Sequence, residues 1–289
     1  MFLNTISNSK SDVIDQCLKK YQFKYIENLP GFPAKNQDSL NLGSFVHKIY
    51  ELGVNCTTKE ELVQIAEQEQ TKYNISYRQK KQAEVCIDNF LSFNKKLGKT
   101  IATEFVFEVD LDAENQIKFN GVIDRVIEGK NGGLLIIDYK TSKVEKTRAD
   151  LFMDGQLKGY AYAAHHLYKK EYSQITCAHY YPITDNLVTI QFPAAAINKW
   201  RVDTINRVWK IRKKKADEFY PTRNKFCDFC QYQPLCPEFA SHKDICERMD
   251  EQMKLKEQRK LEKQASQKDV EAQLQSPKSP EEIPKEQKQ

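Results

Sequence analysis

Two aspartates and a lysine in the middle of the chain are the residues whose types and spacing best indicate chemistry. Asp138 and Lys140 are one residue apart in an apolar stretch, and Asp124 precedes Asp138 by fourteen residues. Because side chains alternate along a strand, Asp138 and Lys140 share one face and Tyr139 takes the other. Carboxylates hold hard divalent cations, and a lysine beside them stabilises hydroxide and the charge of a pentavalent phosphate. An Asp-x-Lys sequence alone is usually a strand edge, but this set points to metal-assisted phosphodiester hydrolysis.

A predicted hairpin must position these residues. The apolar runs Val122–Ile127 and Leu134–Ile137 flank Asn131-Gly132-Gly133, a sequence typical of a hairpin turn. Pairing of the two strands brings Asp124 within reach of Asp138. An alternating segment upstream extends the hairpin to a three-stranded meander, and a further strand pair follows later in the chain. These additional strands are expected at Thr103–Asp110, Ile175–Tyr181 and Leu187–Phe192.

An early helix contributes a histidine. Residues Leu40–Val54 carry an apolar stripe with a spacing of about 3.6 residues. The stripe consists of Leu42, Phe45, Val46, Ile49 and Leu52. His47 lies off the stripe, and Gly43, one turn earlier, leaves space for a ligand beside the imidazole. A lone histidine near an apolar face is most often a structural residue, so a functional role for His47 depends on its context.

Two later helices are predicted at Asp150–Tyr168, with Asp150 as N-cap, and at Ala194–Tyr220. Gln156 and Tyr160 are four residues apart, so they project from one face of the first helix toward the hairpin. The second helix is basic, which indicates either a solvated face or a track for backbone phosphates. With an aromatic and basic segment near the N-terminus, it supplies candidate nucleic-acid contacts. These candidates are Lys19, Lys20, Tyr21, Lys24, Arg212 and Lys213.

Three of the eight cysteines have a spacing typical of metal ligands. They are Cys227, Cys230 and Cys236, with Pro237 directly after the third. Both zinc and an iron–sulfur cubane need four ligands, so the fourth must come from Cys246 or from a distant cysteine such as Cys17. A structural zinc ribbon normally supplies a second Cys-x2-Cys pair. Its absence from the sequence favours an iron–sulfur cluster.

Composition and charge limit the class of protein. A chain of 289 residues that is 40% apolar and 11% aromatic is typical of a globular body, and its net charge of +5 permits an anionic partner without requiring one. No run of 18 apolar residues and no signal-peptide pattern is present, so we expect a cytoplasmic protein without a membrane span. We expect one folded domain over residues 1–245. Residues 246–289 form a charged tail, partly helical and then disordered.

The order of these motifs resembles a known nuclease family. Cys17, Gly43 to His47, Gly121 to Asp124, Asp138-Tyr-Lys140, Gln156 to Tyr160 and the three late cysteines follow one another as in the RecB-type branch of the PD-(D/E)XK nuclease superfamily. The likeness is greater to the branch whose nuclease domain is closed by an iron–sulfur cluster, as in AddB and the CRISPR-associated exonucleases. It covers about residues 5–240. It implies an α/β, restriction-endonuclease-like core with a central mixed sheet flanked by helices, and an iron–sulfur subdomain at the C-terminus.

The resemblance also implies roles for individual residues. The ligands of a catalytic Mg²⁺ or Mn²⁺ would be His47, Asp124, Asp138 and the carbonyl of Tyr139. Lys140 would activate or stabilise the attacking water, and Gln156 and Tyr160 would position it and the scissile phosphate. The ligands of a [4Fe–4S] cluster would be Cys17, Cys227, Cys230 and Cys236. Such a cluster closes a loop of about 210 residues and pins the two ends of the domain together.

We therefore expect a metal-dependent DNA exonuclease that acts on single-stranded ends in recombination, repair or the processing of mobile or CRISPR-related DNA. The sequence lacks the phosphate-binding Gly-Lys-Ser/Thr loop of a helicase, so any unwinding must come from a partner helicase or recombination protein. Two other classes stay open at this point. One is a non-cleaving iron–sulfur accessory module that binds nucleic acid, and the other is a zinc-stabilised interaction protein.

Overall fold

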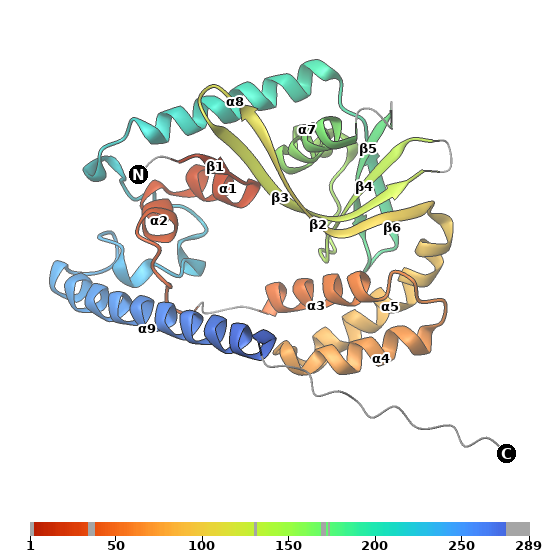
Figure 1. Ribbon diagram of the computed structural model, residues 1–289, viewed down its shortest axis with the longest axis horizontal. Coiled ribbons are helices and arrows are strands. Elements are labelled where there is room, and N and C mark those ends of the chain that lie inside the picture. Colours follow the sequence, from red (N-terminus) through yellow and green to blue (C-terminus); the bar gives the residue numbers. More distant parts are fainter. Residues whose placement is uncertain (1–2, 34–37, 130–131, 169–171, 173, 276–289) are drawn as a thin grey trace.

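A mixed β-sheet lies at the centre of the molecule, with helices against both of its faces (Figure 1). The computed structural model describes residues 3–33, 38–129, 132–168, 172 and 174–275. Within these residues the sheet has six strands. They are β1 (Thr5–Ile6), β2 (Lys99–Asp112), β3 (Ile117–Glu128), β4 (Leu134–Tyr139), β5 (Ile175–Tyr181) and β6 (Asn186–Ile190). The predicted α/β class and the mixed sheet flanked by helices are confirmed.

The strand order places two carboxylates opposite each other. β2, β3 and β4 form the predicted antiparallel meander, β5 pairs parallel with β4, and β6 pairs antiparallel with β5. The pair Arg125↔Ile137 sets the register of β3 against β4, so Asp124 and Asp138 stand at the same level where this ladder ends. β1 pairs with the beginning of β3 along the same edge. The carbonyl of Val122 lies between these two partners and accepts a hydrogen bond from the Tyr160 hydroxyl at 2.7 Å.

Helices form two apolar cores, one on each face of the sheet. Helices α3 (Asp38–Leu52), α4 (Lys59–Glu69) and α5 (Tyr77–Lys96) pack with Ile137 and Tyr180 on one face. Helices α6 (Arg148–Met153), α7 (Gly155–Tyr168) and α8 (Ala194–Arg212) pack with Phe119 and Ile136 on the other. The stripe predicted for α3 is buried except at Leu52, which is 45% exposed. Tyr50 is buried in its place, and its hydroxyl donates to the Cys86 carbonyl at 2.7 Å.

The predicted helix over Asp150–Tyr168 is in fact two helices. Thr147 caps α6 in a capping box in which Asp150 is the third helical residue, so the prediction of Asp150 as N-cap is wrong. The chain breaks at Asp154, whose backbone is extended. Its Oδ1 accepts hydrogen bonds from the backbone amides of Gln156 and Leu157 at 2.9 and 3.0 Å, which starts α7 one turn before Tyr160.

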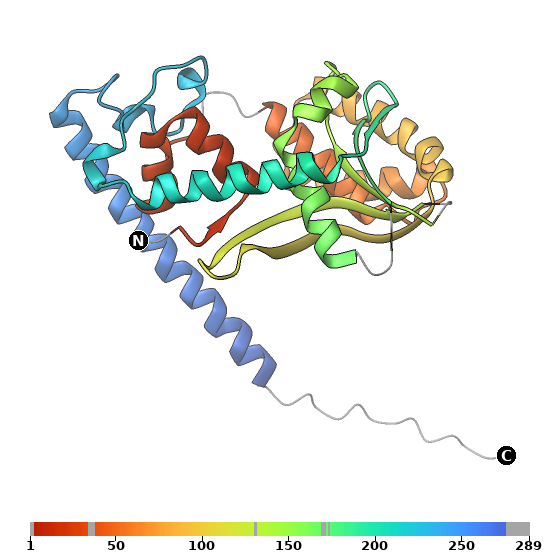
Figure 2. The same ribbon diagram turned by 90° about the horizontal axis from the view of Figure 1, so that it is seen from above.

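The N-terminal helices and the C-terminal part of the chain form a second region beside the sheet. It contains α1 (Asn8–Gln16), α2 (Leu18–Tyr21) and α9 (His242–Gln275), which begins ahead of the boundary expected at residue 246. The short helices of the chain are η1 (Gln22–Ile26), η2 (Gln70–Lys72), η3 (Ala216–Glu218), η4 (Cys227–Phe229) and η5 (Gln233–Leu235). In both views α8 runs from the sheet to this region (Figures 1 and 2). The Arg207 guanidinium on α8 pairs with Asp15 on α1 at 2.9 Å.

Two predictions fall on parts of the chain that the structure does not describe. The turn residue Asn131 and the residues 276–289, for which we expect disorder, lie outside the described residues. Among the residues that are described, none of the helices combines the length and the apolar character needed to cross a bilayer.

Candidate active site

The hairpin, α3 and α7 bring the candidate catalytic side chains to one place. Asp124 comes from β3 and Asp138 from β4, while Lys140 follows the end of β4 directly. His47 projects from α3 on one side of the hairpin, and Gln156 projects from α7 on the other. The sequence order of these residues spans more than a hundred positions, so only the strand pairing and the two helix packings place them together.

Asp124 connects the histidine to the strand that carries Asp138. Its Oδ2 accepts a hydrogen bond from the Tyr139 amide at 2.6 Å and lies 3.5 Å from His47 Nδ1. His47 Nε2 lies 3.0 Å from the Tyr139 carbonyl oxygen. Burial lowers the pKa of His47, but the hydrogen bond and charge of Asp124, together with the charges of Asp138 and Glu104, outweigh burial, so the net pKa of His47 is raised. An imidazole, a carboxylate and a carbonyl oxygen thus converge on one point.

A chain of polar contacts runs from Asp138 to the sheet edge. Lys140 Nζ lies 2.6 Å from Asp138 Oδ2 and donates to Gln156 Oε1 at 3.1 Å. Gln156 Nε2 donates to the Tyr160 hydroxyl at 2.8 Å. Burial raises the pKa of Asp138, and the charge of Lys140 opposes that shift. Burial opposes the charge of Lys140, but Asp138 outweighs it and the pKa of Lys140 is raised. The ammonium group is therefore retained at neutral pH beside the carboxylate.

Three residues behind Asp138 were not found by sequence reasoning. His179 stands opposite Asp138 in the β4–β5 ladder, is fully buried, and its Nε2 lies 3.6 Å from Asp138 Oδ2 and 3.9 Å from Asp154 Oδ2. Lys146 Nζ pairs with the same Asp154 oxygen at 2.6 Å. Burial lowers the pKa of His179, and the nearby Lys140 adds to that effect, so the imidazole is neutral. Asp154, which caps α7, and Asp138 on β4 thus belong to one polar network.

Glu104 on β2 was also missed. Its carboxylate, His47 and Asp124 each offer a ligand atom, and the three atoms lie within 4.8 Å of one another. Burial raises the pKa of Glu104, and the charge of Asp124 raises it further. Glu104, His47 and Lys140 line one open cleft of about 610 Å³ with the Tyr139 backbone. Glu104 was missed because only the pairing of β2 with β3 brings it beside Asp124, and that register was not worked out from the sequence.

The chemistry of these donors fits a hard divalent cation. Carboxylate oxygens, a backbone carbonyl and one imidazole are the ligand types that Mg²⁺ and Mn²⁺ accept in proteins. Burial is the largest cause of the raised pKa values of Asp138 and Glu104, and the negative charge of Asp124 raises both further. A cation bound between them would favour their ionised forms.

Comparison with known protein families gives the arrangement its context. Residues 5–237 match the family model described as the PD-(D/E)XK nuclease superfamily. The chain belongs to this superfamily. No curated protein sequence matches it. A solved structure titled "Crystal structure of SSO0001" is similar to this chain. The match covers 82% of this chain and 88% of the other, with 18% sequence identity and a TM-score of 0.36.

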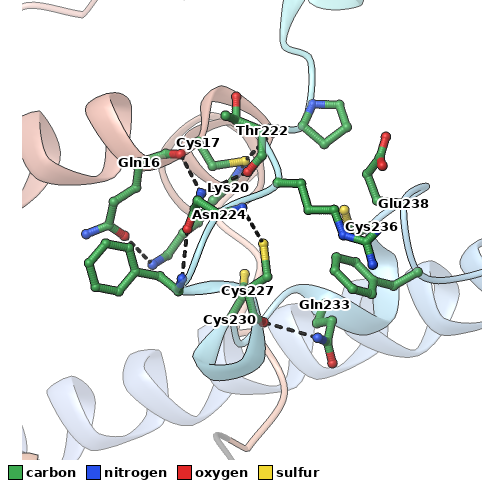
Figure 3. Close-up of a pocket in the computed structure, with 14 residues that line it drawn as sticks. Gln16, Cys17, Lys20, Thr222, Asn224, Cys227, Cys230, Gln233, Cys236 and Glu238 are labelled. Atoms are coloured by element: carbon green, nitrogen blue, oxygen red, sulfur yellow. Dashed lines mark hydrogen bonds between the residues drawn. The ribbon is translucent and has the colours of Figure 1, made fainter.

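Four cysteines of this PD-(D/E)XK superfamily member line one cavity (Figure 3). They are the predicted set Cys17, Cys227, Cys230 and Cys236. Backbone amides donate to two of the sulfur atoms, from Thr222 to Cys17 at 3.4 Å and from Asn224 to Cys227 at 3.3 Å. Burial raises the pKa of the Cys230 and Cys236 thiols. Cys246 does not line this cavity, and its sulfur contacts His242 Nδ1 on α9 at 3.7 Å.

The residues predicted to contact nucleic acid differ in how far they are exposed in this superfamily member. Tyr21 is 2% exposed and stacks on Phe219, so its ring cannot face a nucleic-acid strand and that prediction is wrong. Arg212 is half-buried, its guanidinium donates to the carbonyls of Leu3 and Asn115 and lies over the Trp209 ring, and its contact with nucleic acid stays a prediction. Lys24 and Lys213 are exposed. Lys19 and Lys20 are half-buried, and their Nζ atoms donate to the side chains of Gln22 and Gln16.

Proposed function

We propose that this protein is a divalent-metal-dependent deoxyribonuclease that hydrolyses DNA from free single-stranded ends. The observation that carries the proposal is the convergence of Asp124, Asp138 and Lys140 beside one open cleft, in a chain of the PD-(D/E)XK nuclease superfamily. Superfamily membership supports nuclease chemistry in general. DNA rather than RNA, and an end rather than an internal site, are our proposal for this chain.

The residues at the site have different proposed roles in phosphodiester hydrolysis. Asp124, Asp138, His47 and the Tyr139 carbonyl would hold Mg²⁺ or Mn²⁺, and the bound metal would polarise the phosphoryl oxygen and lower the pKa of an attacking water. The Lys140 ammonium, held by Asp138 and Gln156, stabilises the negative charge that develops on the attacked phosphate. The Tyr160 hydroxyl donates a hydrogen bond to the Val122 carbonyl, so its oxygen accepts the hydrogen bond from Gln156 Nε2. Tyr160 is thus a positioning residue for Gln156.

Strand contacts are proposed for the exposed lysines and for the cleft itself. Lys24 and Lys213 are exposed and can meet backbone phosphates, a contact that carries no base specificity. A helicase or recombination partner in trans would supply single-stranded ends from duplex DNA.

We also propose a [4Fe–4S] cluster on Cys17, Cys227, Cys230 and Cys236. The support is that thiols from both ends of the chain line one cavity and that backbone amides donate to two of the sulfur atoms. Hydrogen bonds of this kind stabilise thiolates and tune cluster potentials. The neighbouring Asn224 side chain donates to the Gln16 carbonyl at 2.9 Å, so the cluster would reinforce an existing junction between N- and C-terminal segments.

The cluster is tested by its colour and its metal content. Anaerobically purified protein should be brown, absorb near about 400 nm and contain iron, and Cys227→Ala should lose all three properties and solubility. Cys246→Ala is the matched control, because Cys246 is exposed and outside the cavity. A colourless wild-type protein that contains zinc would refute the cluster and support a zinc-stabilised interaction protein.

The nuclease function is tested with end-labelled substrates. Purified protein should degrade single-stranded DNA in Mg²⁺ or Mn²⁺ faster than duplex DNA or RNA, and the order of product appearance gives its polarity. Asp138→Asn should abolish cleavage, because a neutral amide is a weaker ligand and no longer holds the Lys140 ammonium. If the wild-type protein binds DNA but cleaves none of these substrates with either metal, the protein is a non-cleaving accessory module.

A further inference from the structure

Glu104 is a cleft residue to which the predicted ligand set gives no role. The pairs Thr103↔Arg125 and Phe105↔Ile123 continue on either side of it, so Glu104 stands opposite Asp124 between β2 and β3. Its backbone has a φ of 45°, in the left-handed region that non-glycine residues rarely adopt. The sheet thus keeps Glu104 in an unfavourable backbone conformation directly beside the carboxylate that bonds the Tyr139 amide.

Lys48 and His47 lie near enough to attract the Glu104 carboxylate, but no direct ion pair within the described residues compensates its charge. Carboxylates directly opposite each other in a sheet repel. In the part of the chain that the structure describes, no lysine or arginine pairs with the Glu104 carboxylate. His47 and Asp124 are the groups that could hold a metal ion together with Glu104, because the three ligand atoms lie within 4.8 Å of one another.

When the carboxylates are ionised, the charges of four groups at the centre of the site match one divalent cation. Asp124, Asp138 and Glu104 carry three negative charges, and Lys140 carries one positive charge. The sum of these four groups is two negative charges, which one divalent cation neutralises. Without Glu104 the same cation would leave the site with an excess positive charge before the substrate phosphate enters. We count His47 as neutral, because a metal-binding imidazole must be deprotonated.

We propose that Glu104 is a further ligand of the divalent cation, which it binds together with His47 and Asp124. This inference rests on the proposed function, because it concerns the cation of the same site. A cation held by both carboxylates would offset their repulsion and would account for the left-handed backbone conformation kept at Glu104.

A direct measurement of Mn²⁺ binding tests this assignment. The full-length protein, free of metal, is titrated with MnCl₂ in a calorimeter. The dissociation constant of Glu104→Gln for Mn²⁺ should be larger than that of the wild type by about tenfold or more. Glu108→Gln is the matched control, since Glu108 lies on the same strand, is exposed and pairs with Lys118. The control should bind Mn²⁺ as the wild type does.

Thermal unfolding separates a ligand from a merely structural glutamate. Without metal, Glu104→Gln should be at least as stable as the wild type, because it removes one of two opposed carboxylates. With saturating Mn²⁺ its melting temperature should rise less than that of the wild type. If Glu104→Gln binds Mn²⁺ as tightly as wild type, the inference fails while the nuclease function stands. If wild-type protein neither binds Mn²⁺ nor cleaves DNA, the proposed function fails as well.

Discussion

Replacing Asp154 by alanine tests whether the cap of α7 positions the catalytic side chains. The Oδ1 atom accepts hydrogen bonds from the Gln156 and Leu157 amides, and Oδ2 pairs with Lys146 at 2.6 Å. Loss of an N-cap costs about 1 kcal/mol. Loss of an ion pair in which the lysine is half-exposed costs up to about 1 kcal/mol more. We therefore expect Asp154→Ala to lower the free energy of unfolding by about 2 kcal/mol.

The accompanying variants separate the cap from its charge. Asp154→Asn keeps an oxygen that can cap α7 and loses only the charge, so it should lose about half as much stability. Asp203→Ala is the surface control, because Asp203 is exposed and pairs with Lys199 on the same helix. It should change stability by less than about 0.5 kcal/mol. Equilibrium denaturation in urea measures all three.

Activity gives the second readout of the Asp154 series. Fraying of the first turn of α7 displaces Gln156, which holds the Lys140 ammonium. Cleavage by Asp154→Ala should therefore fall by about tenfold or more, and cleavage by Asp154→Asn should fall less. The reasoning is refuted if Asp154→Ala unfolds at the same urea concentration as wild type or cleaves DNA at the wild-type rate.

Two further predictions concern packing and pH. Gly159→Ala should cost about 1–3 kcal/mol in urea denaturation, because its Cβ would lie 2.6 Å from Phe119 Cζ and 2.9 Å from Trp200 Cζ2. Gly155→Ala, whose nearest contact is at 3.9 Å, should be neutral or stabilising, and equal losses in both variants would contradict the packing argument. The pKa values of Asp138 and Glu104 are raised, so the metal-free folded state loses stability as pH rises above the ordinary carboxyl range. Since a cation binds the ionised forms, Mg²⁺ should raise the melting temperature more at about pH 8 than at about pH 6, and an equal rise at both would contradict this view of the site.

The hairpin was predictable because its signals are local. The alternation of β3 and β4 and the apolar runs that flank Asp138 and Lys140 dictate which side chains share a face. The apolar period of α3 likewise placed His47 off the buried stripe. Each of these features depends on residues within one helical turn or one strand, so the local sequence pattern is enough to predict it.

Other parts of the site depend on pairing between distant segments. His179 lies in an apolar run that reads as an ordinary buried strand, and only the parallel register of β5 against β4 sets it beside Asp138. Glu104 faces Asp124 through the register of a third strand. Asp154 caps a helix, and the Asp154-Gly155 pair that marks the break was passed over because the segment was read as one longer helix. Tyr21 was misassigned because composition shows charge and aromaticity but not burial.

The most direct test of the proposed nuclease chemistry is the rate of DNA cleavage by Lys140→Ala under single-turnover conditions. Lys143→Ala is the matched control, because Lys143 is an exposed lysine in the same loop. The geometry predicts that Lys140→Ala stays folded and loses about 10²–10⁴ in rate with saturating Mg²⁺ or Mn²⁺, while Lys143→Ala cleaves as the wild type does. A Lys140→Ala protein that cleaves within about tenfold of the wild-type rate would contradict the assignment of this cleft as the active site.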